Sequence, residues 1–194
     1  MRRHRKSPRA QLAAERGWRY ARSGSGDIER RWHTADLDPS DEVAGTLGLP
    51  FTVFDTTVLG APDRAPRTVC VLHLPVELPP AAVIPDPANG EPCAEGRVGP
   101  VPPWAALAFQ HPPELDGAPP PEHPDFADAL VTGGVLDLTR RRGLIGWRIA
   151  GRDLIWVSRP GAPLPPERLV AVIESLAELA AALPADIVAR YRRE

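Results

Sequence analysis

The sequence predicts an α+β fold, in which an antiparallel β-sheet of about five or six strands carries a long C-terminal helix on one face. Two observations support this prediction. Apolar and β-branched residues gather in short runs bounded by glycine and proline, which is typical of strands. Near the C-terminus, apolar residues recur with helical spacing from Glu167 to Leu183, and Pro184 ends the run. A short N-terminal helix completes the predicted fold class.

The chain of 194 residues is long enough for a single domain with a sizeable core. We expect residues 1–9 to form a basic tail and residues 10–194 to form one α+β domain. Fifteen prolines lie between Pro75 and Pro124, and each fixes its own φ and lacks an N–H donor. Residues 79–124 are therefore expected to form an irregular, proline-rich excursion and not a second domain.

The first elements of the domain are a helix and a hairpin. The helix is expected to begin at Pro8, which suits a first helical turn, and to stop at Gly17. Residues 27–36 are a candidate strand. Residues 50–59 and 67–74 are rich in β-branched and aromatic side chains and flank a glycine- and proline-containing loop, which predicts a hairpin.

The last third of the chain is expected to hold a strand at 135–138, a second hairpin and the final helix. Residues 144–157 are interpreted as the hairpin, with Gly151 and Arg152 at its turn. This pairing puts Trp147 opposite Trp156 and Ile149 opposite Leu154. The four side chains then share one face beneath the helix, and we interpret the two indoles as core residues.

Composition limits the function classes. The two cysteines, Cys70 and Cys93, do not make a disulfide framework, which favours a cytoplasmic setting. No apolar run has membrane-spanning length. The excess of arginine, including Arg140–Arg142, is interpreted as a genome bias with solvated side chains, so nucleic-acid binding is not expected. A weak electrostatic contact with an anionic membrane is expected through the N-terminal basic cluster, Arg2, Arg3, Arg5, Lys6 and Arg9.

Asp55 and His73 are the best candidates for an acid–base pair. In the predicted hairpin Asp55 faces Val71, which puts His73 diagonally across from it on the same face. Such a pair could orient an imidazole as a general base. A structural polar pair on a sheet is the favoured interpretation, because ion pairs are more often structural and no serine or cysteine is placed to complete a nucleophilic set.

Other motifs do not complete a site. Cys70 and His73 have the spacing of half a zinc site, but residues three apart on a strand point to opposite faces. Residues 36–41 start like a calcium loop and lack its glycine and its final glutamate. Gly24 and Gly26 lack the third glycine of a dinucleotide fingerprint. We therefore assign no catalytic, cofactor-binding or metal-binding residue.

Several short motifs together resemble a family of uncharacterised actinobacterial proteins. In chain order they are Leu12–Tyr20, Pro50–Asp55, Leu74–Pro79, Pro124–Ala127 and Trp147–Leu154. The resemblance implies no activity, cofactor or catalytic residue. Similar proteins often begin with a membrane-spanning helix followed by a basic stretch. The resemblance therefore implies that Arg2 to Arg9 are a cytoplasmic flank whose anchor is missing or lies upstream.

We expect a non-catalytic cytoplasmic interaction or accessory module with an unidentified protein partner, able to lie at the inner face of the plasma membrane. This expectation depends on the absence of a convergent set of polar catalytic residues beside a well-specified core. No cofactor is expected. The alternative is a small-ligand-binding protein or a hydrolytic enzyme that uses Asp55 and His73.

Overall fold

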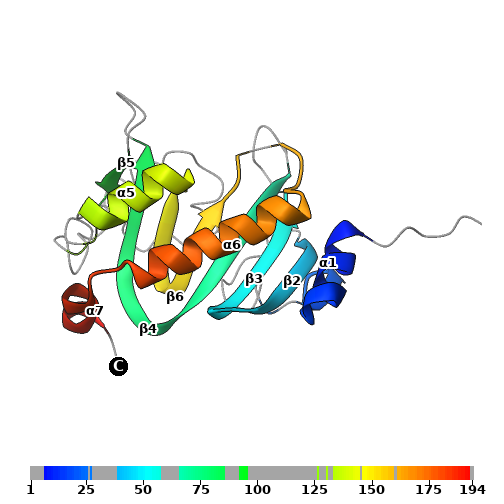
Figure 1. Ribbon diagram of the computed structural model, residues 1–194, viewed down its shortest axis with the longest axis horizontal. Coiled ribbons are helices and arrows are strands. Elements are labelled where there is room, and N and C mark those ends of the chain that lie inside the picture. Colours follow the sequence, from blue (N-terminus) through cyan, green and yellow to red (C-terminus); the bar gives the residue numbers. More distant parts are fainter. Residues whose placement is uncertain are drawn as a thin grey trace, which may run out of the picture.

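The computed structural model describes residues 7–25, 27, 39–57, 66–85, 92–95, 126, 130, 133–144, 146–159 and 161–192. These residues form a six-stranded antiparallel sheet with a long helix lying across one face (Figure 1). The predicted α+β class, its C-terminal helix and its short N-terminal helix are confirmed.

The described elements are six strands and four helices. In chain order they are α1 (Pro8–Arg16), β1 (Arg19–Ser23), β2 (Ser40–Leu47), β3 (Leu49–Thr56), β4 (Arg67–Pro85), β5 (Pro92–Glu95), α5 (Gly133–Arg142), β6 (Trp147–Val157), α6 (Pro166–Ala181) and α7 (Ala185–Tyr191).

Strand β4 is the spine of the sheet. The strand order is β1-β2-β3-β4-β5, and β6 pairs with the other side of β4. The first half of β4 lies between β3 and β6, and its second half lies between β6 and β5. Figure 1 shows β4 turning sharply at its middle, with β6 inside the bend. A single 19-residue strand therefore joins both halves of the sheet.

The prediction that residues 79–124 are irregular is wrong for 79–85 and 92–95, which belong to β4 and β5. Pro75, Pro79 and Pro80 fall where the register between β4 and β6 shifts, between His73 and Ala81. Prolines are tolerated in a sheet where the ladder is interrupted. They bend this strand without ending it. The rest of the predicted excursion lies outside the described residues.

The hairpin predicted at 50–59 and 67–74 is confirmed as β3 and β4, but its register differs from the prediction. Asp55 lies opposite Thr68 and not Val71. A shift by an odd number of residues exchanges the two faces of a strand. Asp55 therefore shares a face with Thr68, and His73 points to the opposite face.

The hairpin predicted at 144–157 is wrong, because Trp147–Val157 is one continuous strand, β6. Gly151 lies at the register irregularity with a φ of +62°, a left-handed conformation that glycine adopts readily. The extra residues of the irregularity lie on β4, because the pairing advances from His73 to Ala81 on β4 while it advances only from Asp153 to Ile149 on β6. The side-chain alternation of β6 switches at Gly151. Odd-numbered residues before Gly151 and even-numbered residues after it consequently face α6. Trp147, Ile149, Leu154 and Trp156 therefore share one face, as predicted, but they do so within one continuous strand and not across a hairpin.

The remaining predicted helices and strands are confirmed in part. Residues 135–138 belong to helix α5 and not to a strand; the spacing of buried Val135 and Leu138 is one helical turn. The sequence did not predict β1, β2 or α7. The candidate strand at 27–36 lies outside the described residues except for Asp27. Helix α1 begins at Pro8 as predicted and ends at Gly17, which has a φ of +67°.

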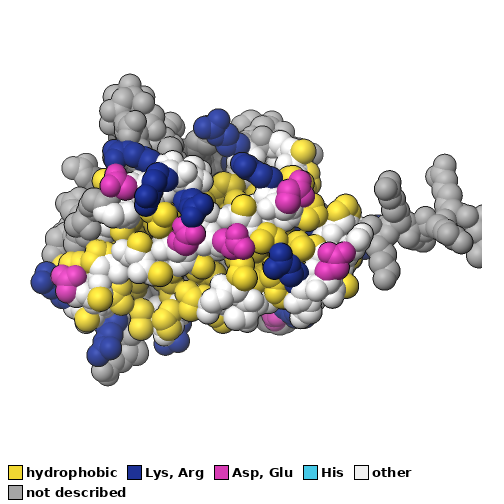
Figure 2. Space-filling model, viewed as in Figure 1, with side chains coloured by type: hydrophobic (Ala, Val, Ile, Leu, Met, Phe, Trp, Pro, Cys, Tyr) yellow, Lys and Arg dark blue, Asp and Glu magenta, His cyan; other side chains and the backbone are white. Residues whose placement is uncertain are grey.

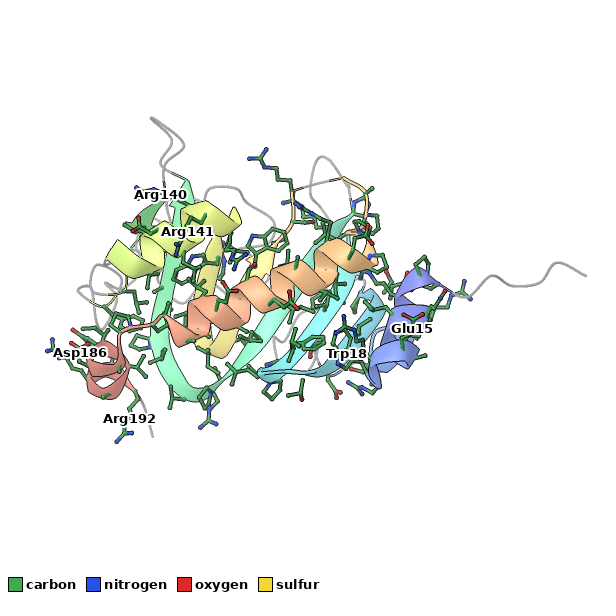
Figure 3. The ribbon with its side chains drawn as sticks, in the orientation of Figure 1. Glu15, Trp18, Arg140, Arg141, Asp186 and Arg192 are labelled. Carbon is green, nitrogen blue, oxygen red and sulfur yellow. The ribbon has the colours of Figure 1, made fainter. Side chains whose placement is uncertain are left out.

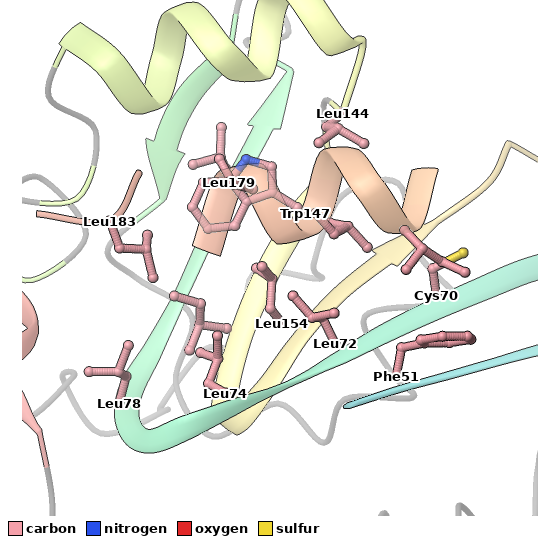
Figure 4. Close-up of a cluster of buried hydrophobic side chains, with 14 of the residues drawn as sticks. Phe51, Cys70, Leu72, Leu74, Leu78, Leu144, Trp147, Leu154, Leu179 and Leu183 are labelled. Atoms are coloured by element: carbon pink, nitrogen blue, oxygen red, sulfur yellow. The ribbon is translucent and has the colours of Figure 1, made fainter. Parts of the chain in front are cut away.

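The core lies between the sheet and α6 (Figure 4). Trp147 is fully buried there, and its indole N–H donates to Thr139 Oγ1 of α5 over 3.0 Å. Leu176 of α6 is also buried. Trp156 packs against the same core but is only partly buried. This apolar layer holds α6 on the sheet and leaves one end of the same face to polar residues.

Candidate functional site

The first polar cluster lies on the α6 face, at the end of the sheet near α1. Arg9 of α1 donates from Nη2 to Asp55 Oδ1 over 2.6 Å and to Thr68 Oγ1 over 3.1 Å. Thr68 Oγ1 donates to Asp55 Oδ1 over 2.6 Å and accepts the Leu164 N–H over 3.0 Å. We call these three side chains, Arg9, Asp55 and Thr68, the Arg9 cluster. It joins α1, β3, β4 and the segment before α6.

The Arg9 cluster is closed to solvent. The exposed fractions of the Arg9 and Asp55 side chains are 5% and 8%. A threonine hydroxyl has one proton and two lone pairs, and all three are used at Thr68. Burial raises the pKa of Asp55, while Thr68 and Arg9 act in the opposite direction. The cluster has the composition of a buried ion pair and leaves no open position for a substrate.

Tyr20 and Asp41 extend the Arg9 cluster toward β1 and β2. Arg9 Nη1 donates to the Asp41 carbonyl oxygen over 3.3 Å, and the Tyr20 hydroxyl donates to the Asp41 carboxylate. Asp41 has a φ of +48°, in the left-handed region that only a few non-glycine residues adopt. Burial and the hydrogen bond to Asp41 raise the pKa of Tyr20. These contacts hold the bulged start of β2 against α1.

The second polar cluster lies on the opposite face of the sheet. His73 of β4 is bonded through Nδ1 to Asp153 Oδ1 of β6 over 2.9 Å and through Nε2 to Thr52 Oγ1 of β3 over 3.1 Å. We call these side chains, Thr52, His73 and Asp153, the His73 cluster. The His73 side chain is 21% exposed and that of Asp153 is 8% exposed. The His73 imidazole is therefore more open to solvent than either charged side chain of the Arg9 cluster.

The predicted pairing of Asp55 with His73 is wrong. The observed register puts the two side chains on opposite faces, and each belongs to its own cluster. Sequence reasoning missed Arg9, which was placed in a solvated tail, and it also missed Asp153 and Thr52 as partners of His73. Arg9 lies one turn before Ala13, which is also buried, and this spacing is the signal that Arg9 faces the body.

The other candidate residues lie apart from one another. Cys70 is a buried free thiol on the α6 face, and burial raises its pKa to about 12. His73 points to the other face, so the two cannot share a metal ion. The part of the chain that the structure describes contains no group of three residues suited to a metal. The Trp156 indole N–H is buried and has no hydrogen-bond partner among the described residues.

The arginines of α5 are exposed surface residues. Arg142 forms two hydrogen bonds with the Glu178 carboxylate of α6, at 3.0 and 2.7 Å, and Arg140 lies 3.6 Å from Asp137. Figure 2 shows basic side chains gathered over α5, beside acidic side chains along α6. Arg140 and Arg141 lie on the outer side of α5, away from Trp18 (Figure 3). Ion pairing therefore neutralises part of this patch.

Comparisons with known proteins identify a similar fold. No family model matches the chain, and no curated protein matches it at a significant level. The crystal structure of the mycobacterial trehalose monomycolate transport factor A, TtfA, is similar over 93% of this chain and 98% of that chain. The TM-score is 0.54 and the sequence identity is 12%. At this identity the likeness shows a shared fold.

Proposed function

We propose that this chain is an accessory module that acts by binding a protein partner at the cytoplasmic face of a membrane, beside a membrane transport system. The observation that carries the proposal is the closed Arg9 cluster. Asp55 was the best candidate for an acid–base residue in the sequence. In the structure its carboxylate belongs to the hydrogen-bonded cluster that joins four segments of the chain. The fold is shared with TtfA, whose name describes a transport factor.

The membrane contact is proposed for the four basic residues that precede α1: Arg2, Arg3, Arg5 and Lys6. Arg9 is not part of this contact, because its guanidinium is buried against Asp55. Among the described residues, no helix has the length and apolarity needed to cross a membrane. Attraction to anionic lipid is worth about 1 kcal/mol per basic residue near the surface, so four residues give a weak and salt-sensitive contact.

Vesicle binding tests the membrane contact. The purified chain is expected to sediment with phosphatidylserine vesicles at low salt and to be released at high salt, and not to sediment with phosphatidylcholine vesicles. A variant with all four basic residues changed to glutamine should lose this binding. The matched control changes Arg140, Arg141 and Arg142 to glutamine and should retain it. Equal binding by the tail variant would contradict this contact.

In-cell cross-linking tests the partner. A tagged chain in its native cells is expected to cross-link to an integral membrane protein of a transport system. The tail variant should cross-link less, because it lies at the membrane less often. Recovery of the chain only as a free monomer would overturn the proposed accessory role. The actinobacterial family resemblance stays a prediction, and it agrees with this cellular setting.

A further inference from the structure

The His73 cluster has the bonding order of a nucleophile, a base and an orienting acid. Thr52 Oγ1 lies 3.1 Å from Nε2 of His73, and Nδ1 lies 2.9 Å from Asp153 Oδ1. A carboxylate only accepts hydrogen bonds, so Nδ1 carries the proton of a neutral ring and Nε2 accepts from the threonine hydroxyl. Both distances lie in the range that marks an activated nucleophile.

Three neighbouring strands hold these groups in place. His73 lies directly opposite Asp153 in the ladder between β4 and β6, and Thr52 lies on β3, opposite Val71. The side chain of Asp153 is nearly buried, whereas the side chains of His73 and Thr52 are partly exposed. The orienting acid is therefore shielded, and the two groups that would meet a substrate can be reached from solvent.

From this arrangement we propose that Thr52, His73 and Asp153 form a site for acyl transfer from small carboxylic esters. In the first step Thr52 Oγ1 bonds to the carbonyl carbon and its proton passes to His73 Nε2. The bond from that carbon to the leaving oxygen then breaks, and the alcohol departs with the proton. Water hydrolyses the acyl-threonine in the second step, with His73 again as the base.

The surroundings define the substrate class. Val71 and Ile155, the apolar neighbours on this face, are already buried. Among the described residues the site therefore has no open apolar wall for a long acyl chain, and an acetyl group is the fitting size. The strand N–H groups beside Thr52 belong to the sheet ladder, so no backbone donor there stabilises the oxyanion, and both acylation of Thr52 and hydrolysis of the acyl-threonine should be slow. The inference goes beyond the proposed binding role and does not depend on it.

The test treats the full chain with p-nitrophenyl acetate and maps the acetyl group by peptide mass spectrometry. Background acetylation of amines is limited, because Lys6 is the single lysine. We expect acetylation of Thr52 in the native chain and in Thr52→Ser, and none at this position in Thr52→Val. His73→Gln should lower the rate by about 100-fold or more. Thr46→Val, an exposed position on β2, is the matched control and should match the native chain.

Acetyl groups found only at Lys6 or the N-terminus would overturn the proposal, and so would equal acetylation of Thr52 in His73→Gln. Circular dichroism checks that each variant is folded. If Thr52→Val does not fold, the comparison of Thr52→Ser with His73→Gln decides. Failure here leaves the vesicle and cross-linking results unchanged, so it is distinguishable from failure of the proposed accessory function.

Discussion

The two polar clusters on the sheet contain similar side chains and differ in their surroundings. The Arg9 cluster is enclosed between α1, the sheet and the start of α6, and its threonine hydroxyl has no unused hydrogen-bonding capacity. The His73 cluster lies on the opposite face, with its imidazole 21% exposed. The enclosed Arg9 cluster stabilises the fold by joining separate segments. The partly exposed His73 cluster can be reached by a small molecule from solvent.

Removal of Arg9 should give the largest loss of stability. In Arg9→Met, Asp55 stays buried without its cation, and breaking a buried ion pair by removing one partner costs about 3–5 kcal/mol. Chemical denaturation measures the free energy of unfolding. The control is Arg16→Met, an exposed arginine of the same helix whose guanidinium lies 5.7 Å from the centre of the Trp18 ring, and it should change the free energy of unfolding by no more than about 1 kcal/mol. Equal losses of the free energy of unfolding in Arg9→Met and Arg16→Met would contradict the enclosure of the Arg9 cluster.

The loss caused by Arg9→Met should depend on pH. Without the guanidinium, the raised pKa of Asp55 should rise further, because one of the two groups that lower it is gone. A raised folded-state pKa means that the folded variant binds a proton that the unfolded chain does not, so its stability falls as pH increases through that window. The variant and native stabilities should therefore approach each other as pH falls. A constant difference across pH would contradict this.

The apolar part of the same sheet face gives a second loss of stability with which the loss in Arg9→Met can be compared. Leu176→Ala in α6 should cost about 2–5 kcal/mol, because the side chain is fully buried between helix and sheet. Val172→Ala, on the same helix and partly exposed, should cost less. Thermal unfolding followed by circular dichroism compares the two. If both variants had native stability, α6 would not be the cover of the core.

A matched pair of threonines compares the two clusters directly. Thr68→Val removes a hydroxyl that makes three hydrogen bonds, two of them buried and one partly buried, so it should cost about 1–3 kcal/mol. Denaturant unfolding of the purified variant measures this loss. A loss near zero would show that the Arg9 cluster does not need its threonine.

Thr52→Val should have the smallest effect on stability. It removes one partly exposed hydrogen bond to His73, so the loss should be no more than about 1 kcal/mol. The same unfolding experiment applies, with Thr68→Val beside it. A larger loss for Thr52 than for Thr68 would reverse the distinction between the closed and the open cluster.

Local sequence signals predicted the elements that depend on local periodicity. The apolar spacing of Leu169, Ile173, Leu176 and Leu179 defined α6, and all four are buried. The β-branched runs defined β3 and most of the first half of β4. The predicted hairpin put Trp147 and Leu154 on one face, and the structure confirms the shared face although the two residues belong to one continuous strand.

The remaining features depend on pairing between distant segments. Gly151 has a positive φ inside a continuous strand, as it would in a hairpin turn, so its conformation alone does not distinguish the two. Prolines in β4 suggested irregular structure, but the strand continues because β6 pairs with it on both sides of the interruption. Arg9 belongs to the core only because Asp55 and Thr68 arrive from other strands.

The separation of the clusters is tested most directly by a double-mutant cycle between Asp55 and His73, using Asp55→Asn, His73→Gln and the double variant. The two side chains lie on opposite faces and bond to different side chains among the described residues, so their effects on the free energy of unfolding should add to within about 0.5 kcal/mol. A coupling energy above about 1 kcal/mol would mean that they act as one site, and would contradict this account.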